Sequence, residues 1–292
     1  MTKSVSVEKQ LTRVVKSRGY RFFASTVSFF GALPVVLLLG ACGQQSSSSE
    51  PLELSTIVRE NAIVGGKLAS TKDWVAHHIV GLMITDGPTH QQAICTGTII
   101  SEDTVMTAAH CMPDPKGSLE VRFGLKILDG SGRFKSAHVS GYKANELYKS
   151  HSENTKETHD IALVHFDGGL PAGFVPAEIL QSDNVLEDGA IVTLSGYGVS
   201  NGVTNQGSGI LRKVDVNILH ADFSKSEVEI DQSASKGACY GDSGGPAFVQ
   251  SGKQLFVWGV TSRGANGCAS TSVYTKATAY RSWISKTMTA LR

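Results

Sequence analysis

From residue 63 onward, the chain consists of short runs rich in β-branched residues, separated by turns that contain glycine. Such runs have the length and composition of β-strands; three of them lie at residues 93–100, 191–194 and 254–260. No run alternates with a long helical pattern, so barrels or a sandwich are favoured over a βαβ architecture. One helix is predicted at residues 280–291, where Ile284, Met288 and Leu291 recur at helical spacing. The pattern predicts an all-β domain with a C-terminal helix.

Charge is divided unevenly between the front of the chain and the rest. The whole chain has 27 basic and 26 acidic side chains, of which seven basic and four acidic ones lie in residues 1–62. Residues 63–292 therefore carry a net charge of −2. With 41% hydrophobic and 18% charged residues, the chain can bury a core, which excludes a disordered protein. Because no strong basic field is present, nucleic acid is not expected as a partner.

The first 41 residues have the pattern of an export signal. Six basic residues lie between residues 1 and 21, and a largely apolar run follows at residues 22–39. The run ends in Leu-Gly-Ala-Cys, which resembles a bacterial lipoprotein box. That resemblance implies cleavage before Cys42 and attachment of lipid to its thiol. A plain secretory signal and a spanning helix with an incidental cysteine are the alternatives, and all three predict an exported chain.

The chain has five cysteines, an odd number for an exported protein. If Cys42 carries lipid, four remain, and the sequence alone allows three pairings of them. Pairing Cys95 with Cys111 and Cys239 with Cys268 would close loops of 17 and 30 residues. Each bridge would stabilise the fold by on the order of 3 to 4 kcal/mol in the loop-entropy model. Free buried thiols are the alternative, which an oxidising compartment disfavours.

Four short motifs occur in a characteristic order: Ile-Val-Gly-Gly at 63–66, Thr-Ala-Ala-His-Cys at 107–111, His-Asp-Ile-Ala-Leu-Val at 159–164 and Gly-Asp-Ser-Gly-Gly-Pro at 241–246. His110 precedes Asp160 by 50 residues, and Asp160 precedes Ser243 by 83. Together they resemble the chymotrypsin/trypsin-like serine peptidases, and the resemblance covers residues 63–292 with both cysteine pairs and the final helix. It implies two six-stranded antiparallel β-barrels, with the active site between them and a C-terminal helix.

These residue types also supply the chemistry that peptide hydrolysis needs. A serine hydroxyl is a poor nucleophile at neutral pH and needs a base within hydrogen-bond reach, for which histidine titrates in the useful range. We therefore expect Ser243 as nucleophile, His110 as base, and Asp160 as the carboxylate that orients the imidazole and stabilises its charged form. The N–H groups of Gly241 and Ser243 are expected to form the oxyanion hole, with each donor contributing about 3 to 4 kcal/mol.

A second carboxylate, Asp242, precedes the expected nucleophile. In the resembled family, the corresponding aspartate is buried and pairs with the α-ammonium group created by cleavage before an Ile-Val-Gly-Gly sequence. Here that cut would fall between Ala62 and Ile63. Because a buried carboxylate without a partner is costly, such a pair is a credible activation switch. The alternative is that residues 63–66 are simply a first strand and turn.

The specificity pocket is predicted to be neutral. By the resemblance, Gly237 lies at its base, where trypsin-like members place an aspartate, so cleavage after Lys or Arg is disfavoured. Gly264 and Ser272 align with its walls, and their small size favours an aromatic or medium-sized apolar side chain. Arg263 stands where an aromatic residue is usual; it could attract acidic substrates or point into solvent, and solvent is the favoured interpretation.

The sequence thus predicts three parts: a signal peptide (1–41), a lipid-attachment site with tether and activation peptide (42–62), and a peptidase domain (63–292). The predicted function is that of an exported, lipid-anchored serine endopeptidase zymogen acting on proteins or peptides. Protein inhibitors are a further class of partner, and lipid on Cys42 would hold the precursor on the outer membrane or cell surface until activation leaves it periplasmic or extracellular.

The alternative function is that of a catalytically silent binding protein on the same scaffold, since a fold does not fix a function. The presence of all three expected catalytic residues favours the enzyme. No cofactor is expected. No metal is expected either, because the loop after Gly124 continues with Leu125 and Lys126 and lacks the carboxylate of calcium-binding relatives.

Overall fold

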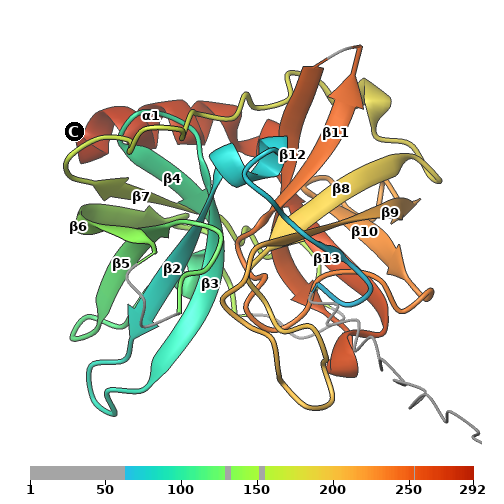
Figure 1. The fold of residues 1–292 in the computed structure, drawn as a ribbon. Helices are drawn as coiled ribbons and strands as arrows, with labels where there is room; N and C mark the ends of the chain where they lie inside the picture. Colours follow the sequence, from blue (N-terminus) through green and yellow to red (C-terminus); the bar gives the residue numbers. More distant parts are fainter. Residues whose placement is uncertain (1–62, 129–132, 151–154, 253) are drawn as a thin grey trace, which may run out of the picture. The chain divides into compact units, whose positions relative to one another are not determined.

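Two antiparallel barrels follow each other along the chain in the computed structural model, which describes residues 63–292 apart from 129–132, 151–154 and 253 (Figure 1). The first barrel closes in the order β2-β3-β4-β7-β6-β5, and each neighbouring pair is antiparallel. Its strands are β2 (Ile79–Thr85), β3 (Gln92–Ile99), β4 (Thr104–Thr107), β5 (Ser118–Phe123), β6 (Lys135–Ala144) and β7 (Ala162–Phe166).

The second barrel has the order β9-β10-β13-β12-β11-β8 and closes by the pairing of β8 with β9, while β1 (Lys67–Leu68) extends β9 at its edge. Its strands are β8 (Ile191–Gly196), β9 (Arg212–His220), β10 (Glu227–Gln232), β11 (Pro246–Ser251), β12 (Gln254–Gly264) and β13 (Ser270–Lys276). The predicted fold class of two six-stranded antiparallel barrels is confirmed.

The predicted C-terminal helix is confirmed as α1 (Arg281–Leu291), which contacts β6 and β7 of the first barrel. Ile284 is buried, and Met288 and Leu291 pack beside it on the same core, as their helical spacing requires. The remaining helices are short 3-10 turns: η1 (Trp74–His77), η2 (Ala109–Cys111), η3 (Asp183–Val185), η4 (Asn266–Cys268) and η5 (Ala277–Tyr280).

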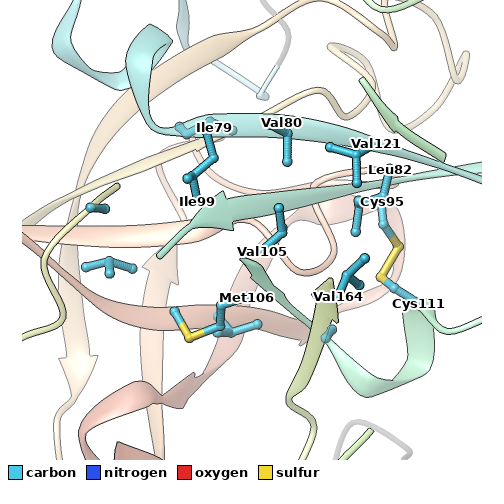
Figure 2. Packing of buried hydrophobic residues seen from close by; sticks show 14 of the residues in the cluster. Ile79, Val80, Leu82, Cys95, Ile99, Val105, Met106, Cys111, Val121 and Val164 are labelled. Atoms are coloured by element: carbon cyan, nitrogen blue, oxygen red, sulfur yellow. A yellow bond between two sulfur atoms is a disulfide. The ribbon is translucent and has the colours of Figure 1, made fainter. Parts of the chain in front are cut away.

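Burial along β2 and β3 explains why these strands do not alternate between apolar and polar residues. Ile79 to Met83 and Cys95 to Ile99 are all buried, because one face fills the first barrel and the other meets β8 or β11 of the second. Figure 2 shows the core inside the first barrel, including Ile79, Val80, Leu82, Ile99, Val105, Met106, Val121 and Val164.

Two disulfides hold segments that flank the site. Cys95 on β3 is bonded to Cys111 at the end of η2 (Figure 2), so His110 lies next to a cross-link. Cys239, four residues before Ser243, is bonded to Cys268 at the end of η4. Of the three pairings that the sequence allows, the structure contains the one that forms the two shortest loops.

The barrels are joined directly at the loop that carries Ser243. Thr96 on β3 donates its N–H to the carbonyl of Ser243 at 2.8 Å and its hydroxyl to the carbonyl of Gly241 at 2.9 Å. Gly244 has φ of +77°, and a Cβ there would collide with Thr107 and with the backbone of Thr96. The close approach of the two barrels at this point therefore requires glycine.

Candidate active site

His110 and Asp160 form a hydrogen-bonded pair between η2 and the residues that precede β7. The Nδ1 atom of His110 lies 2.8 Å from Oδ2 of Asp160, and the backbone N–H of His110 donates to Oδ1 at 3.0 Å. The Asp160 side chain is fully buried, whereas 25% of the His110 side chain is exposed. This contact fixes Nδ1 as the nitrogen that carries a proton and leaves Nε2 for chemistry.

The pKa of Asp160 reflects two opposing effects. Burial acts to raise it, but the hydrogen bond and positive potential from His110, together with a 2.7 Å hydrogen bond from the Ser262 hydroxyl, hold the pKa below its ordinary value. Asp160 is therefore an anion at neutral pH. An anion in this position stabilises an imidazolium at His110.

Ser243 lies in a tight loop and lines the same cavity as His110. Within this loop, the N–H groups of Asp242, Gly244 and Gly245 donate to backbone carbonyls. Among the described residues, by contrast, the N–H groups of Gly241 and Ser243 donate to no acceptor. Gly241 has φ of +97°, which is a left-handed conformation that favours glycine. The loop thus leaves two neighbouring donors free for a ligand oxygen.

Asp242 is buried beneath this loop. Its Oδ1 accepts from the N–H of Gly198 and its Oδ2 from the N–H of Cys239, both at 2.8 Å. Burial raises its pKa from the ordinary 3.8 to about 7, although these hydrogen bonds and the charge of Arg212 oppose the rise. A carboxylate with this environment would be stabilised by a further cation.

The first described residues lie against the same region. Ile63 is 1% exposed and belongs to the core of the second barrel. The carbonyl of Val64 accepts a 3.0 Å hydrogen bond from the N–H of Gly237. The segment that begins at Ile63 is therefore bonded to the chain six residues before Ser243.

A cavity of about 350 Å³ opens beside His110 and Ser243. The two predicted wall residues, Gly264 and Ser272, line it. The two disulfide-bonded cysteines, Cys239 and Cys268, line it too. Among the described residues, none that lines it is acidic; besides His110 and Ser243 the lining residues are Ala238, Cys239, Tyr240, Thr261, Ser262, Arg263, Gly264, Ala265, Asn266, Cys268 and Ser272. The charged arginine in this lining, Arg263, is paired with an acidic side chain outside the lining, Glu227.

The placement of Gly237 at the base of this cavity needs a correction. Gly237 does not line the cavity, and a Cβ on it would collide with the side chain of Gln232. Gln232, the last residue of β10, is buried; its Nε2 donates to the carbonyls of Ala238 and Cys268 at 3.2 and 3.3 Å, and its Oε1 accepts from the N–H of Ala238 at 3.0 Å. A neutral amide therefore backs two of the lining residues. Sequence reasoning missed Gln232 because nothing marks a strand-end glutamine as a pocket support.

The prediction that Arg263 points into solvent is wrong. Its side chain is 4% exposed and forms a buried ion pair with Glu227, with Nη1 and Oε1 2.8 Å apart. Burial acts to raise the pKa of Glu227, but Arg263 and Thr158 outweigh that effect and lower it. The sequence could not reveal this partner because it lies 36 positions away on another strand.

Among the described residues, one group of side chains has the spacing of metal ligands without the chemistry to bind a metal ion. Ligand atoms of Cys95, His110 and Cys111 lie within 4.8 Å of one another. Both sulfurs are bonded to each other, so they offer no thiolate, and His110 already faces Asp160. This group is better explained as a disulfide beside a histidine.

A family comparison decides the relationship of this chain. The model of the trypsin family matches residues 63–284. The chain belongs to the trypsin family. Its match begins at the residue where activation cleavage was predicted and ends within α1. As a trypsin-family member with proteases among its relatives, the chain is a serine endopeptidase.

Individual relatives align with most of this chain. Urokinase-type plasminogen activator of Gallus gallus is 29% identical over 283 residues, covering 86% of this chain and 60% of that protein. Brachyurin of Leptuca pugilator is 29% identical over 234 residues, covering 76% and 96%, and hypodermin-B of Hypoderma lineatum is 31% identical over 242 residues, covering 78% and 88%. The chain thus spans less than two thirds of the first of these relatives.

The predicted signal peptide, lipid-bearing Cys42 and activation peptide lie outside the described residues. Among the described residues, no helix is both long and apolar enough to span a bilayer.

Proposed function

We propose that residues 63–292 hydrolyse peptide bonds through a Ser243, His110 and Asp160 triad and an acyl-enzyme. The observation that carries this proposal is the buried Asp160 contact to Nδ1 of His110, at the mouth of a cavity that Ser243 also lines. His110 takes the proton of the Ser243 hydroxyl through Nε2 as Oγ attacks the scissile carbonyl carbon. His110 then gives that proton to the leaving amine, and water releases the acyl group by the same route.

The tetrahedral intermediate needs donors for its oxyanion. The N–H groups of Gly241 and Ser243, which have no acceptor among the described residues, are proposed to supply them. Backbone hydrogen bonds to Thr96 and Thr261 hold the loop that carries these donors.

Covalent labelling tests the enzyme against the alternative of a silent binding protein. After activation, a fluorophosphonate should label the wild-type chain on Ser243 and should leave the Ser243→Ala chain unlabelled. A folded, cleaved wild-type chain that resists labelling would favour the binding protein.

The chain is further proposed to be made as a zymogen that is cut between Ala62 and Ile63. Two observations support this: Ile63 is buried in the second barrel, and Asp242 lies buried with only backbone donors to its oxygens among the described residues. A new ammonium group at Ile63 would add a second cation to the charge of Arg212.

Specificity is proposed to be for uncharged side chains before the scissile bond. The activated enzyme should prefer Phe, Tyr, Leu or Met over Lys or Arg by at least about tenfold in kcat/KM, roughly 1.4 kcal/mol. The physical reason is that, in the part of the chain that the structure describes, no acidic side chain lines the cavity to neutralise a buried cation. Profiling on a peptide library measures this preference, and a trypsin-like profile would contradict it.

Export and lipid attachment remain proposals that rest on residues 1–42. The precursor is proposed to be held at a membrane by acyl chains on Cys42, and stable anchoring needs more than one chain. Both disulfides of the peptidase domain lie after the cut, so no bridge connects Cys42 to it. Residues 63–292 also carry a net charge of −2, which offers no attraction to an anionic surface.

Activation should therefore also release the peptidase domain. Cells that make the Ser243→Ala chain should retain it in the membrane fraction, and cleavage by an added activator should move the 63–292 fragment to the soluble fraction. A matched Cys42→Ser chain should be absent from the membrane fraction before cleavage. A cleaved fragment that stays with membranes after a high-salt wash would contradict release.

A further inference from the structure

A buried ion pair lies beside the proposed triad and has no part in the proposed mechanism of hydrolysis. Arg263, near the end of β12, forms two hydrogen bonds with Glu227, the first residue of β10, at 2.8 Å and 3.1 Å. The two side chains are 4% and 0% exposed. Such a bidentate contact between planar groups fixes the geometry of both partners. The pair is therefore a rigid feature of the second barrel.

The same two side chains bind the loop of the first barrel that leads to Asp160. The Nη2 atom of Arg263 also donates to the carbonyl of Thr155. Glu227 accepts from the N–H of Glu157 at 3.0 Å and from the hydroxyl of Thr158 at 2.7 Å. Every one of these contacts crosses from one barrel to the other.

The loop also contributes a carboxylate, Glu157, that binds the second barrel. Glu157 accepts from the N–H of Lys225 at 2.7 Å and from the hydroxyl of Ser226. Glu157 and Glu227 thus each bind the backbone of the segment that carries the other. We call Arg263, Glu227 and Glu157 the inter-barrel clamp.

The loop needs such support because its backbone is strained. Glu157 and His159 have φ of 56° and 54°, and neither is glycine. Residues in this left-handed region persist only where the surrounding structure holds them. Asp160 follows directly, so the position of its carboxylate depends on contacts that keep the loop in this conformation.

A second connection runs through Ser262, the neighbour of Arg263. Its hydroxyl donates to Oδ2 of Asp160 at 2.7 Å, and Nη1 of Arg263 lies 3.4 Å from the same hydroxyl oxygen. The clamp therefore reaches Asp160 from the loop backbone and from β12.

We propose that Arg263 is a positioning residue for Asp160: by holding the loop at residues 155–160 on the second barrel, it aligns the Asp160 carboxylate with His110. This inference rests on the proposed triad. The Arg263 side chain is 4% exposed, and its Nη1 and Nη2 groups donate to Glu227 and Thr155, so it acts on the reaction through Asp160. Loss of Arg263 should lower kcat and leave KM nearly unchanged.

The test compares Arg263→Met, Arg263→Lys and a control, Lys213→Met, in chains cut at Ile63. Lys213 pairs with Asp73 and lines a different cavity. We expect Arg263→Met to lower kcat at least about tenfold with KM within about twofold of wild type. Arg263→Lys should recover part of kcat, because an ammonium group can pair with Glu227 but lacks the planar fork. The control should keep wild-type kcat.

A spectroscopic measurement separates positioning from a purely structural role. The Nδ1–H proton of His110 that faces Asp160 should give a low-field ¹H resonance, which should shift upfield or broaden in Arg263→Met while near-ultraviolet circular dichroism stays native. If Arg263→Met does not fold, Arg263→Lys decides by the same two readouts.

Three results would overturn the inference: a folded variant with kcat within about twofold of wild type, an unchanged Nδ1–H resonance, or a rise in KM alone. Failure of the proposed function looks different, because the wild-type chain itself would then show neither turnover nor fluorophosphonate labelling.

Discussion

Replacing Ser243 by Ala is expected to abolish peptide hydrolysis by the activated chain, with a fall in kcat of about 10⁴-fold to 10⁶-fold. The hydroxyl supplies the nucleophilic oxygen, and without it no acyl-enzyme can form, even though His110 and the oxyanion donors are still present. The loop is held by backbone hydrogen bonds of Ser243 and its neighbours, which alanine retains. The free energy of unfolding should therefore change by less than about 1 kcal/mol.

Steady-state turnover of an uncharged peptide substrate and thermal unfolding measure the two parts of this prediction. A matched control is Ser282→Ala on the exposed face of α1, which should keep wild-type kcat and stability. Turnover by Ser243→Ala at the wild-type rate would remove the triad assignment. A large loss of stability in that variant would instead show that the hydroxyl has a structural role.

Several strands and the C-terminal helix were predictable because local sequence patterns indicate them. Runs rich in β-branched residues gave β3, β8 and β12, and the spacing of Ile284, Met288 and Leu291 gave α1. Closure into two barrels was an expectation from the family resemblance. It depends on pairings such as β2 with β5, which are distant in sequence and have no local signature.

Residues of the candidate site were predictable only where they lie in a recognisable sequence motif. His110, Asp160, Gly241 and Ser243 lie in such motifs, and the structure brings the first two into contact and places Ser243 on the same cavity. The buried polar residues that support these side chains and the cavity were not predicted.

Arg263 was expected to point into solvent, as most arginine side chains do. That expectation failed because Glu227 supplies a buried counter-charge from another strand. Gln232 was missed for a related reason: its amide satisfies the backbone of Ala238 and Cys268, and no pattern in the sequence announces partners that meet only in the folded chain.

Cleavage before Ile63 is expected to raise kcat/KM by at least about 10²-fold to 10³-fold, the effect of losing or gaining one well-placed oxyanion donor. Asp242 lies directly between Gly241 and Ser243, so the energy of its carboxylate is coupled to the loop that presents both donors. In the precursor that carboxylate has a pKa raised to about 7 by burial. A new ammonium group at residue 63 would stabilise its charged form.

A cut at a defined bond tests this prediction. Residues 59–62 would be replaced by a recognition sequence whose protease cuts directly before residue 63. The matched control inserts one glycine before Ile63, so that the chain is cut in the same loop and keeps the Ile63 side chain, but its ammonium group lies about 3.8 Å too far along the chain. Only the correct terminus should give full activity. A fully active uncut chain, or a control as active as the correctly cut chain, would contradict the proposed activation switch.

The same switch predicts a pH dependence of stability in the Ser243→Ala chain. Asp242 binds a proton more tightly in the folded precursor than in the unfolded chain, so the precursor should lose stability as pH rises from about 4 to about 7, by at most about 4 kcal/mol. An ammonium partner lowers the pKa of Asp242 and removes this loss. The cut chain should therefore exceed the precursor in Tm by more at pH 7 than at pH 5. An equal difference at both pH values would show that the stabilisation comes from burial of the Ile63 side chain alone, without the charge pair.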